Sequence, residues 1–202
     1  FRGQELPNGQ EGYVVVRLPL PPGCMPTLWK DDERFLEYVN KIPGCYVTGD
    51  GGYYDEDGYI FIMGRIDDVI NVAGHRLSTG AMEEVVSKHK DVAECAVLGV
   101  QDQLKGEVPL GFVVLKAGSD RDPAEIEQEL VRMVRDEIGA VACFKQCVVV
   151  KALPKTRSGK ILRSTMRKIA NGEDFDVPST IEDASVLGSI TDATQKIGYG
   201  KK

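Results

Sequence analysis

The chain has 202 residues, of which 42% are hydrophobic, enough to bury one or two cores. Its 25 Lys and Arg against 31 Asp and Glu give a formal net charge of −6, which favours neither nucleic acid nor an anionic membrane surface as a partner. The longest apolar runs fall far short of the roughly 20 residues that span a bilayer. Any anion binding must therefore depend on local positive charge.

Five cysteines are present, an odd number, and none forms a Cys-x-x-Cys pair. This pattern indicates neither a disulfide framework nor a zinc site, and we expect no metal ligands. It favours a reducing intracellular compartment, the mitochondrial matrix or the cytoplasm. The sequence starts at Phe1 without a leader-like segment, so we expect the native N-terminus to be missing.

The first third of the chain is predicted to be rich in strands. Residues 12–17 are β-branched and favour a strand, prolines between residues 19 and 26 exclude regular structure, and residues 31–39 favour a short helix. Residues 53–63 predict two strands joined by a turn at Asp57-Gly58.

After Asp67 the pattern changes to alternating helices and strands. A helix capped by Ser78 is expected to run to Lys90, and a second opens at Asp122-Pro123. Apolar residues make one face of this second helix: Ile126, Leu130, Val131, Val134 and Ile138. Strands are expected at 94–100, 111–116 and 147–150, and a final helix is expected to end at Ile169.

These elements predict a mixed α+β protein. Residues 1–66 form a β-rich piece, and residues 67–172 form a small compact α+β domain with a short mixed sheet and flanking helices. Residues 173–202 are polar and are expected to be a loose tail.

A basic segment, PKTRSGKILRSTMRK at residues 154–168, is the most informative stretch. Ser158-Gly159 permits unusual backbone shapes, so we expect Lys160 on a pliant loop, where its ammonium suits an anionic substrate. The segment is not a Walker-A loop, because Pro154 stands where that pattern needs glycine. A nucleic-acid patch is the competing interpretation, but aromatic residues do not interleave the basic ones.

Two upstream segments carry further candidates: YVTGD at residues 46–50 and GRIDDVINVAGHRL at residues 64–77. Asp50 is suited to accept hydrogen bonds from the two hydroxyls of a ribose, or is a solvated turn residue. Asp67 lies where the pattern changes and tolerates the backbone angles of a hinge, or pairs with Arg65 on the surface.

The second of these segments, residues 64–77, also contains a candidate phosphate-binding residue and a stretch of backbone with almost no side chains. The Arg76 guanidinium can form a fork onto phosphate oxygens, or is simply a solvated arginine. Ala73-Gly74 lets a thin ligand lie close to the backbone. His75 has no nucleophile motif nearby, so we give it no catalytic role.

Taken in their order along the chain, residues 46–50, 64–77 and 154–168, the three segments resemble the AMP-forming acyl-CoA synthetases of the adenylate-forming superfamily. Residues 68–77 and the lysine segment are most similar to the short-chain branch, the acetyl- and propionyl-CoA synthetases. The chain departs from common family patterns at Asn71, where many relatives carry lysine, and at Val47, where arginine is usual.

The resemblance implies a role for each candidate. Lys160 is the catalytic residue of adenylation. Asp50, Arg65 and Arg76 bind ATP or AMP. Asp67 is the pivot between two domains. Ala73, Gly74 and Arg135 contact coenzyme A, Arg135 by its spacing from the lysine segment.

The implied reaction joins a short carboxylic acid to coenzyme A through an acyl-adenylate, releasing AMP and pyrophosphate. ATP with Mg²⁺ and coenzyme A are substrates, and no prosthetic group, nucleic acid or membrane span is expected. Residues 1–66 would end a large ATP- and acyl-binding domain whose phosphate loop and acyl pocket lie upstream, so this C-terminal fragment alone should be inactive.

Two alternatives remain open. The C-terminal piece could be a regulatory or interaction module whose lysine loop is a modification target. The protein could also be a degenerate family member that binds a nucleotide without turning it over.

Overall fold

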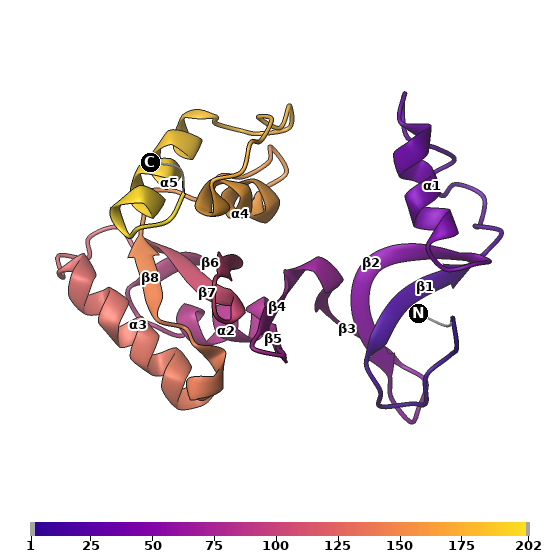
Figure 1. Ribbon diagram of the computed structural model, residues 1–202, viewed down its shortest axis with the longest axis horizontal. Coiled ribbons are helices and arrows are strands. Elements are labelled where there is room, and N and C mark those ends of the chain that lie inside the picture. The colour runs from indigo at the N-terminus through magenta and orange to yellow at the C-terminus, as the bar shows by residue number, and fades with distance from the viewer. Residues whose placement is uncertain (1–2, 201–202) are drawn as a thin grey trace. The chain divides into compact units, whose positions relative to one another are not determined.

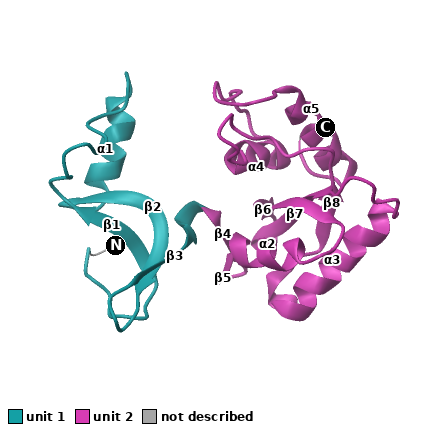
Figure 2. Ribbon diagram, turned by 180° about the vertical axis from the view of Figure 1, so that it is seen from behind, with its two compact units in different colours: residues 1–67 teal, residues 68–202 magenta. Residues whose placement is uncertain are grey.

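A computed structural model describes residues 3–200 of the chain. The chain divides into two compact units, residues 1–67 and 68–202, which Figure 2 shows in two colours. The sequence placed the boundary one residue earlier, between residues 66 and 67. No helix within residues 3–200 is both long enough and apolar enough to cross a bilayer.

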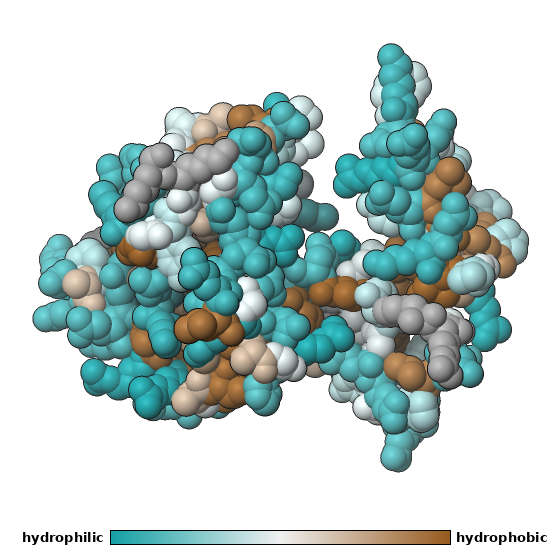
Figure 3. Space-filling model, viewed as in Figure 1, coloured by the Kyte–Doolittle hydropathy of each residue, from teal (hydrophilic) through white to brown (hydrophobic). Residues whose placement is uncertain are grey.

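The first unit is built on an antiparallel sheet in the order β1-β2-β3. Its strands are β1 (Gly12–Arg17), β2 (Cys45–Tyr54) and β3 (Ile60–Arg65), and one helix, α1 (Asp32–Asn40), precedes β2. The predicted strands and the turn at Asp57-Gly58 are confirmed, because Gly58 has a φ of +84° and the Asp55 carboxylate accepts the N–H groups of Asp57 and Tyr59. Apolar residues also reach the surface of this unit, as the brown patches in Figure 3 show.

The second unit contains a mixed five-stranded sheet. Its strands are β4 (Val69–Val72), β5 (His75–Ser78), β6 (Val92–Asp102), β7 (Gly106–Leu115) and β8 (Gln146–Val149). The order is β5-β4-β7-β6, all antiparallel, and β8 pairs with β7 in parallel. The predicted fold class, mixed α+β with a short mixed sheet, is confirmed. The β4–β5 hairpin was not predicted.

Helices cover both faces of this sheet (Figure 1). Helices α2 (Thr79–Ser87) and α3 (Pro123–Glu137) share one core with the sheet, in which Met82, Ile126 and Leu130 are buried. Helices α4 (Arg163–Asn171) and α5 (Ser185–Lys196) share the other. The predicted caps are present, since Ser78 Oγ accepts from Ala81 N–H and Asp122 Oδ1 from Ala124 N–H.

The expectation of a loose tail after residue 172 is wrong for the part that the structure describes. Helix α5 packs Leu187 and Ile190 into the core, and Ile181 before it is buried as well. Leu187, Ile190 and Thr194 recur at helical spacing and make a narrow buried stripe. The polar composition of the segment hid this stripe, because three buried positions are enough to dock a short helix.

Candidate functional site

The segment that carries Lys160 folds as a β-hairpin between β8 and α4. Lys155 and Ile161 form an antiparallel bridge across it, and Leu162 N–H donates to the Pro154 carbonyl at 2.9 Å. We call residues 154–162 the lysine hairpin. Its defined shape differs from the pliant loop that the sequence led us to expect.

Thr156 organises the tip of the lysine hairpin. Its N–H donates to the Lys160 carbonyl at 2.8 Å, its Oγ1 accepts from Lys160 N–H at 3.1 Å, and its carbonyl accepts from Gly159 N–H at 2.8 Å. Gly159 has a φ of +83°, in the left-handed region that glycine enters without steric cost. The backbone on both sides of the Lys160 Cα is therefore held by the rest of the turn.

Two ion pairs fix the ends of the lysine hairpin to the body of the unit. Lys155 Nζ lies 2.5 Å from Glu94 Oε1 on β6. Arg163, at the start of α4, makes a bidentate pair with Glu83 on α2, and Glu83 Oε1 also accepts from Val97 N–H at 2.9 Å. Burial lowers the pKa of Arg163, but the Glu83 carboxylate more than offsets this and raises it above its usual value. Arg163 is thus a permanently charged anchor directly after the hairpin.

The Lys160 side chain is exposed, unlike these anchors. Among residues 3–200 its ammonium makes no ion pair or hydrogen bond with a carboxylate. The hairpin therefore presents an uncommitted cation on a fixed backbone, and an incoming anion can bind it without displacing an internal partner.

The β4–β5 turn exposes almost bare backbone at Ala73 and Gly74. Both have positive φ, +48° and +90°, as a two-residue type I′ turn requires. Gly74 N–H donates to Asn71 Oδ1 at 3.1 Å, and Ala73 N–H donates to the Lys105 carbonyl at 2.8 Å. A Cβ added at Gly74 would meet nothing within 4 Å. The turn is thus rigid and open on its outer side.

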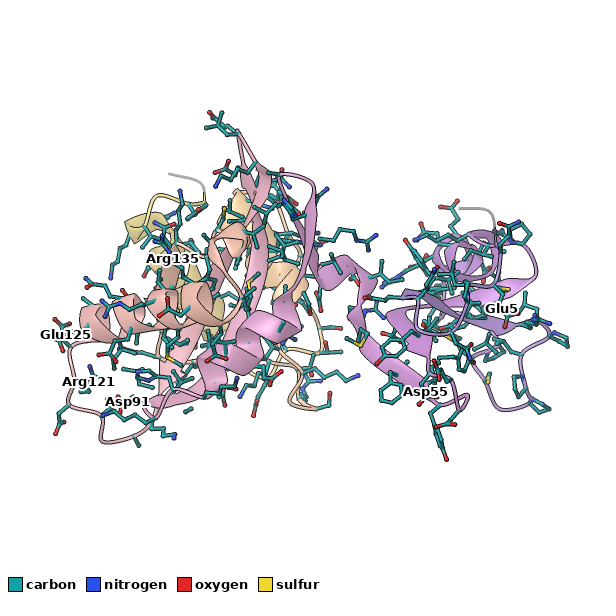
Figure 4. All side chains as sticks on the ribbon, turned by 90° about the horizontal axis from the view of Figure 1, so that it is seen from below. Glu5, Asp55, Asp91, Arg121, Glu125 and Arg135 are labelled. Atoms are coloured by element: carbon teal, nitrogen blue, oxygen red, sulfur yellow. The ribbon has the colours of Figure 1, made fainter. Side chains whose placement is uncertain are left out.

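Arg76 and Arg135 lie on two further elements of the same unit. Arg76 is exposed on β5, opposite Asn71 on β4. Arg135 is exposed in the last turn of α3, where Figure 4 labels it. Within residues 3–200, the side chains of Lys160, Arg76 and Arg135 form no hydrogen bond or ion pair with one another. The structure does not bring these three cations into direct contact.

In the first unit, Arg65 forms ion pairs with the two other candidates of that unit, Asp50 and Asp67. Its Nη1 lies 3.5 Å from Asp50 Oδ1 and donates to the Thr48 carbonyl at 3.0 Å, while its Nε donates to Asp67 Oδ1 at 3.1 Å. Asp50 lies within β2 opposite Arg65 on β3, so it is a strand residue and not a turn residue. The surface pair of Arg65 with Asp67 is present, and such exposed pairs contribute about 0–1 kcal/mol.

Gly49 leaves room for the Arg65 guanidinium. It has a φ of +84°, and a Cβ there would lie 2.6 Å from Arg65 Nη2. The arginine head therefore lies directly against the glycine backbone. Thr48 and Gly49, which precede Asp50, therefore also position the Arg65 side chain: the Thr48 carbonyl accepts its hydrogen bond, and Gly49 leaves space for it.

Sequence reasoning missed the residues that hold these candidates in place. Thr156 and Thr48 act through a hydroxyl and a carbonyl, and Glu83 lies 80 residues from its partner Arg163. A threonine four residues before the lysine is a usable signal, because its hydroxyl can accept a backbone N–H within a turn. No local pattern links Glu83 to Arg163.

Comparison with known proteins places this architecture in a family. The model of the AMP-binding enzyme C-terminal domain matches residues 81–160. An uncharacterized protein of Pseudomonas aeruginosa is 60% identical over 189 residues, 93% of this chain and 30% of its own length. Acyl-CoA synthetase short-chain family member 3, mitochondrial, of Mus musculus is 50% identical over 194 residues, 96% of this chain and 28% of its own length. The chain thus spans less than a third of these relatives.

A solved structure agrees with the sequence comparison. The amide bond synthetase McbA of Marinactinospora thermotolerans superposes with a TM-score of 0.66 and 33% identity, over 82% of this chain and 32% of its own. Residues 81–160 are therefore an AMP-binding enzyme C-terminal domain, and the chain is a homologue of the short-chain acyl-CoA synthetases in the adenylate-forming superfamily.

Proposed function

We propose that the intact protein is an AMP-forming short-chain acyl-CoA synthetase, an acid-thiol ligase. A carboxylate such as acetate or propionate attacks the α-phosphate of ATP, giving an acyl-adenylate and pyrophosphate. The thiol of coenzyme A then attacks the acyl carbonyl and displaces AMP. The relatives support this reaction. The main structural observation in its favour is the ammonium of Lys160, which has no internal carboxylate partner within residues 3–200 and stands on the lysine hairpin.

Adenylation requires a cation because two anions must approach each other. An ammonium near the α-phosphate and the attacking carboxylate offsets their repulsion and stabilises charge that develops on the phosphoryl oxygens. Lys160 supplies this charge on a long side chain, while its backbone stays fixed by Thr156. ATP brings Mg²⁺ as part of the substrate, and no prosthetic group enters the proposal.

Asp50 and Arg65 form the ribose grip in this proposal. The Asp50 carboxylate accepts from the two ribose hydroxyls, and the Arg65 guanidinium, 3.5 Å away, holds its orientation. Arg76 donates to a phosphate oxygen with the planar fork that arginine offers.

Thioester formation uses a different surface of the C-terminal unit. The open turn at Ala73 and Gly74 lets the thin pantetheine arm pass close to the backbone, and Arg135 contacts a phosphate of coenzyme A. Asp67 ends the first unit at the boundary with the second, so it is our pivot for a rotation that exchanges the lysine hairpin for this turn.

The proposed compartment is intracellular and reducing, the mitochondrial matrix or the cytoplasm. All five cysteines lie within the described residues as free thiols. The mouse relative carries the word mitochondrial in its name.

Exchange of labelled pyrophosphate into ATP tests the function on the intact protein. We expect exchange that depends on added acetate or propionate and weakens with longer acids, and acyl-CoA should form when coenzyme A is added. Binding of ATP without exchange, whichever acid is supplied, would contradict the synthetase and favour a nucleotide-binding or regulatory module.

A further inference from the structure

A distant segment adds a third strand to the lysine hairpin. Arg157 N–H donates to the Thr180 carbonyl at 3.0 Å, and Glu182 N–H donates to the Lys155 carbonyl at 2.9 Å. Thr156 and Ile181 form the antiparallel bridge between these two bonds. Residues 180–182, which we call the brace, therefore pair with the arm of the hairpin that precedes Lys160.

The brace is itself anchored in the core. Ile181 is 8% exposed and belongs to the core that α4 and α5 share with the sheet. A turn closed by Ile181 N–H and the Pro178 carbonyl at 3.0 Å leads into the brace, and α5 follows it. Each end of the brace is thus fixed by contacts that do not involve the hairpin.

An isolated hairpin of this size needs such support. Two-stranded hairpins are marginally stable in water, and a third strand with buried side chains is what usually stabilises them. The brace also satisfies the Arg157 N–H and the Lys155 carbonyl on the outer side of the hairpin. Thr156 is the hairpin residue that pairs with Ile181 in the antiparallel bridge. It is also the residue that makes two hydrogen bonds with Lys160.

We propose that the brace positions Lys160 for adenylation, which makes Ile181 and Glu182 positioning residues. This inference rests on the proposed function of Lys160. The brace holds Thr156 in register, Thr156 holds the Lys160 backbone, and the ammonium reaches the α-phosphate from a fixed base. The C-terminal segment thereby acts on the first half-reaction without touching a substrate.

Glu182→Pro in the intact protein tests the proposal, because Glu182 is exposed and the substitution removes its N–H from the bond to Lys155. Ser179→Pro is the matched control. Ser179 occupies the second position of the turn that Ile181 N–H closes onto Pro178, where proline is favoured. Both variants add a proline to the same segment, but only one removes a bond to the hairpin.

Three readouts are needed: hydrogen exchange at the Arg157 amide, pyrophosphate exchange, and thioester formation from supplied acyl-adenylate. For Glu182→Pro we expect Arg157 to exchange roughly threefold to tenfold faster, the factor that matches one lost hydrogen bond. Pyrophosphate exchange should fall by a similar factor, with thioester formation within about twofold of wild type. Ser179→Pro should change none of the three.

A second pair of variants guards against a simple loss of folding. Ile181→Ala removes the anchor of the brace, and Ile190→Ala removes a fully buried isoleucine of α5 from the same core. At matched thermal stability, only Ile181→Ala should accelerate exchange at Arg157 and slow adenylation selectively. Equal slowing of both half-reactions by both variants would assign the segment a purely structural role and overturn the proposal.

The remaining outcomes separate this inference from the proposed function. Faster amide exchange at Arg157 with unchanged adenylation would overturn the positioning role while the synthetase stands. Failure of the wild-type protein to exchange pyrophosphate with any acid would remove the proposed function, and the positioning role for adenylation with it. In that case amide exchange would still show whether the brace holds the hairpin.

Discussion

Thr156 and Lys160 are joined twice across the tip of the lysine hairpin. The Thr156 N–H donates to the Lys160 carbonyl at 2.8 Å, and the Lys160 N–H donates to Thr156 Oγ1 at 3.1 Å. One of these bonds belongs to the backbone and survives any substitution other than proline. The other depends on the threonine hydroxyl, which also shares a hydrogen bond of 2.9 Å with Ser158 Oγ. Removing the hydroxyl therefore breaks both side-chain bonds and leaves the backbone bond in place.

Replacing Thr156 with valine keeps the β-branched shape and removes the hydroxyl. The loss of the hydroxyl's bonds to Lys160 N–H and Ser158 Oγ should slow adenylation about threefold to tenfold and leave thioester formation from acyl-adenylate near wild type. Pyrophosphate exchange and single-turnover thioester formation measure the two steps. Thr156→Ser retains the hydroxyl and should behave like wild type; a serine variant as slow as the valine variant would refute the role of these bonds.

Gly49→Ala should displace Arg65 from Asp50. The new Cβ would lie 2.6 Å from Arg65 Nη2, so the guanidinium must move away. We expect the KM for ATP to rise about tenfold, which corresponds to about 1.4 kcal/mol of lost nucleotide binding. Gly58→Ala is the matched control, because Gly58 has the same φ of +84° with nothing within 4 Å of its Cβ position. An unchanged KM for ATP in Gly49→Ala would argue against the ribose grip.

Ala73→Asn tests the surface assigned to coenzyme A. Ala73 has a φ of +48°, which asparagine adopts more readily than alanine, so thermal stability should stay equal or rise. The larger side chain should nevertheless obstruct the pantetheine arm and slow thioester formation, with pyrophosphate exchange unaffected. Ala73→Gly relieves the backbone without adding bulk and should keep both rates. Wild-type thioester formation in the asparagine variant would contradict a ligand path over this turn.

Glu129 makes the stability of the C-terminal unit depend on pH. It accepts two bonds from Arg121 and one from the buried His89, near the start of α3 where Figure 4 labels Arg121 and Asp91. Hydrogen bonding from Arg121, and next from His89, lowers the pKa of Glu129 from 4.5 to about 2. A carboxylate with a lowered folded-state pKa stabilises fully above its unfolded pKa and loses that contribution as pH falls.

The free energy of unfolding should therefore decline between pH 4.5 and about 2 more steeply in wild type than in Glu129→Gln. Urea unfolding at several pH values in this window measures both slopes. Because Glu129→Gln cannot titrate at this position, identical slopes in the two proteins would show that the Arg121 pair does not bias folding.

The predictable part of the fold was the part with strong local signals. Asp122-Pro123 followed by Ile126, Leu130 and Val134 specified α3, since a cap and a helical apolar stripe are both local. The four-residue strands β4 and β5 carry too few positions to show a period. Helix α5 was missed because its buried stripe is narrow and its exposed faces are polar.

The candidate site divides in the same way. Lys160, Asp50 and Arg76 were found by resemblance to family motifs, which local sequence carries. The brace and the pair of Arg163 with Glu83 join residues far apart in the chain, and only the folded structure brings them together. Their assigned roles in catalysis stay predictions.

Lys160→Ala in the intact protein tests the central claim most directly. Both pyrophosphate exchange with acetate or propionate and thioester formation from supplied acyl-adenylate should be measured. We predict that exchange falls by a factor of about 100 or more, in the range typical of a lost electrostatic contact to the transition state, while thioester formation continues near the wild-type rate. Undiminished exchange, or equal loss of both steps in a folded variant, would contradict the assignment of Lys160 to adenylation.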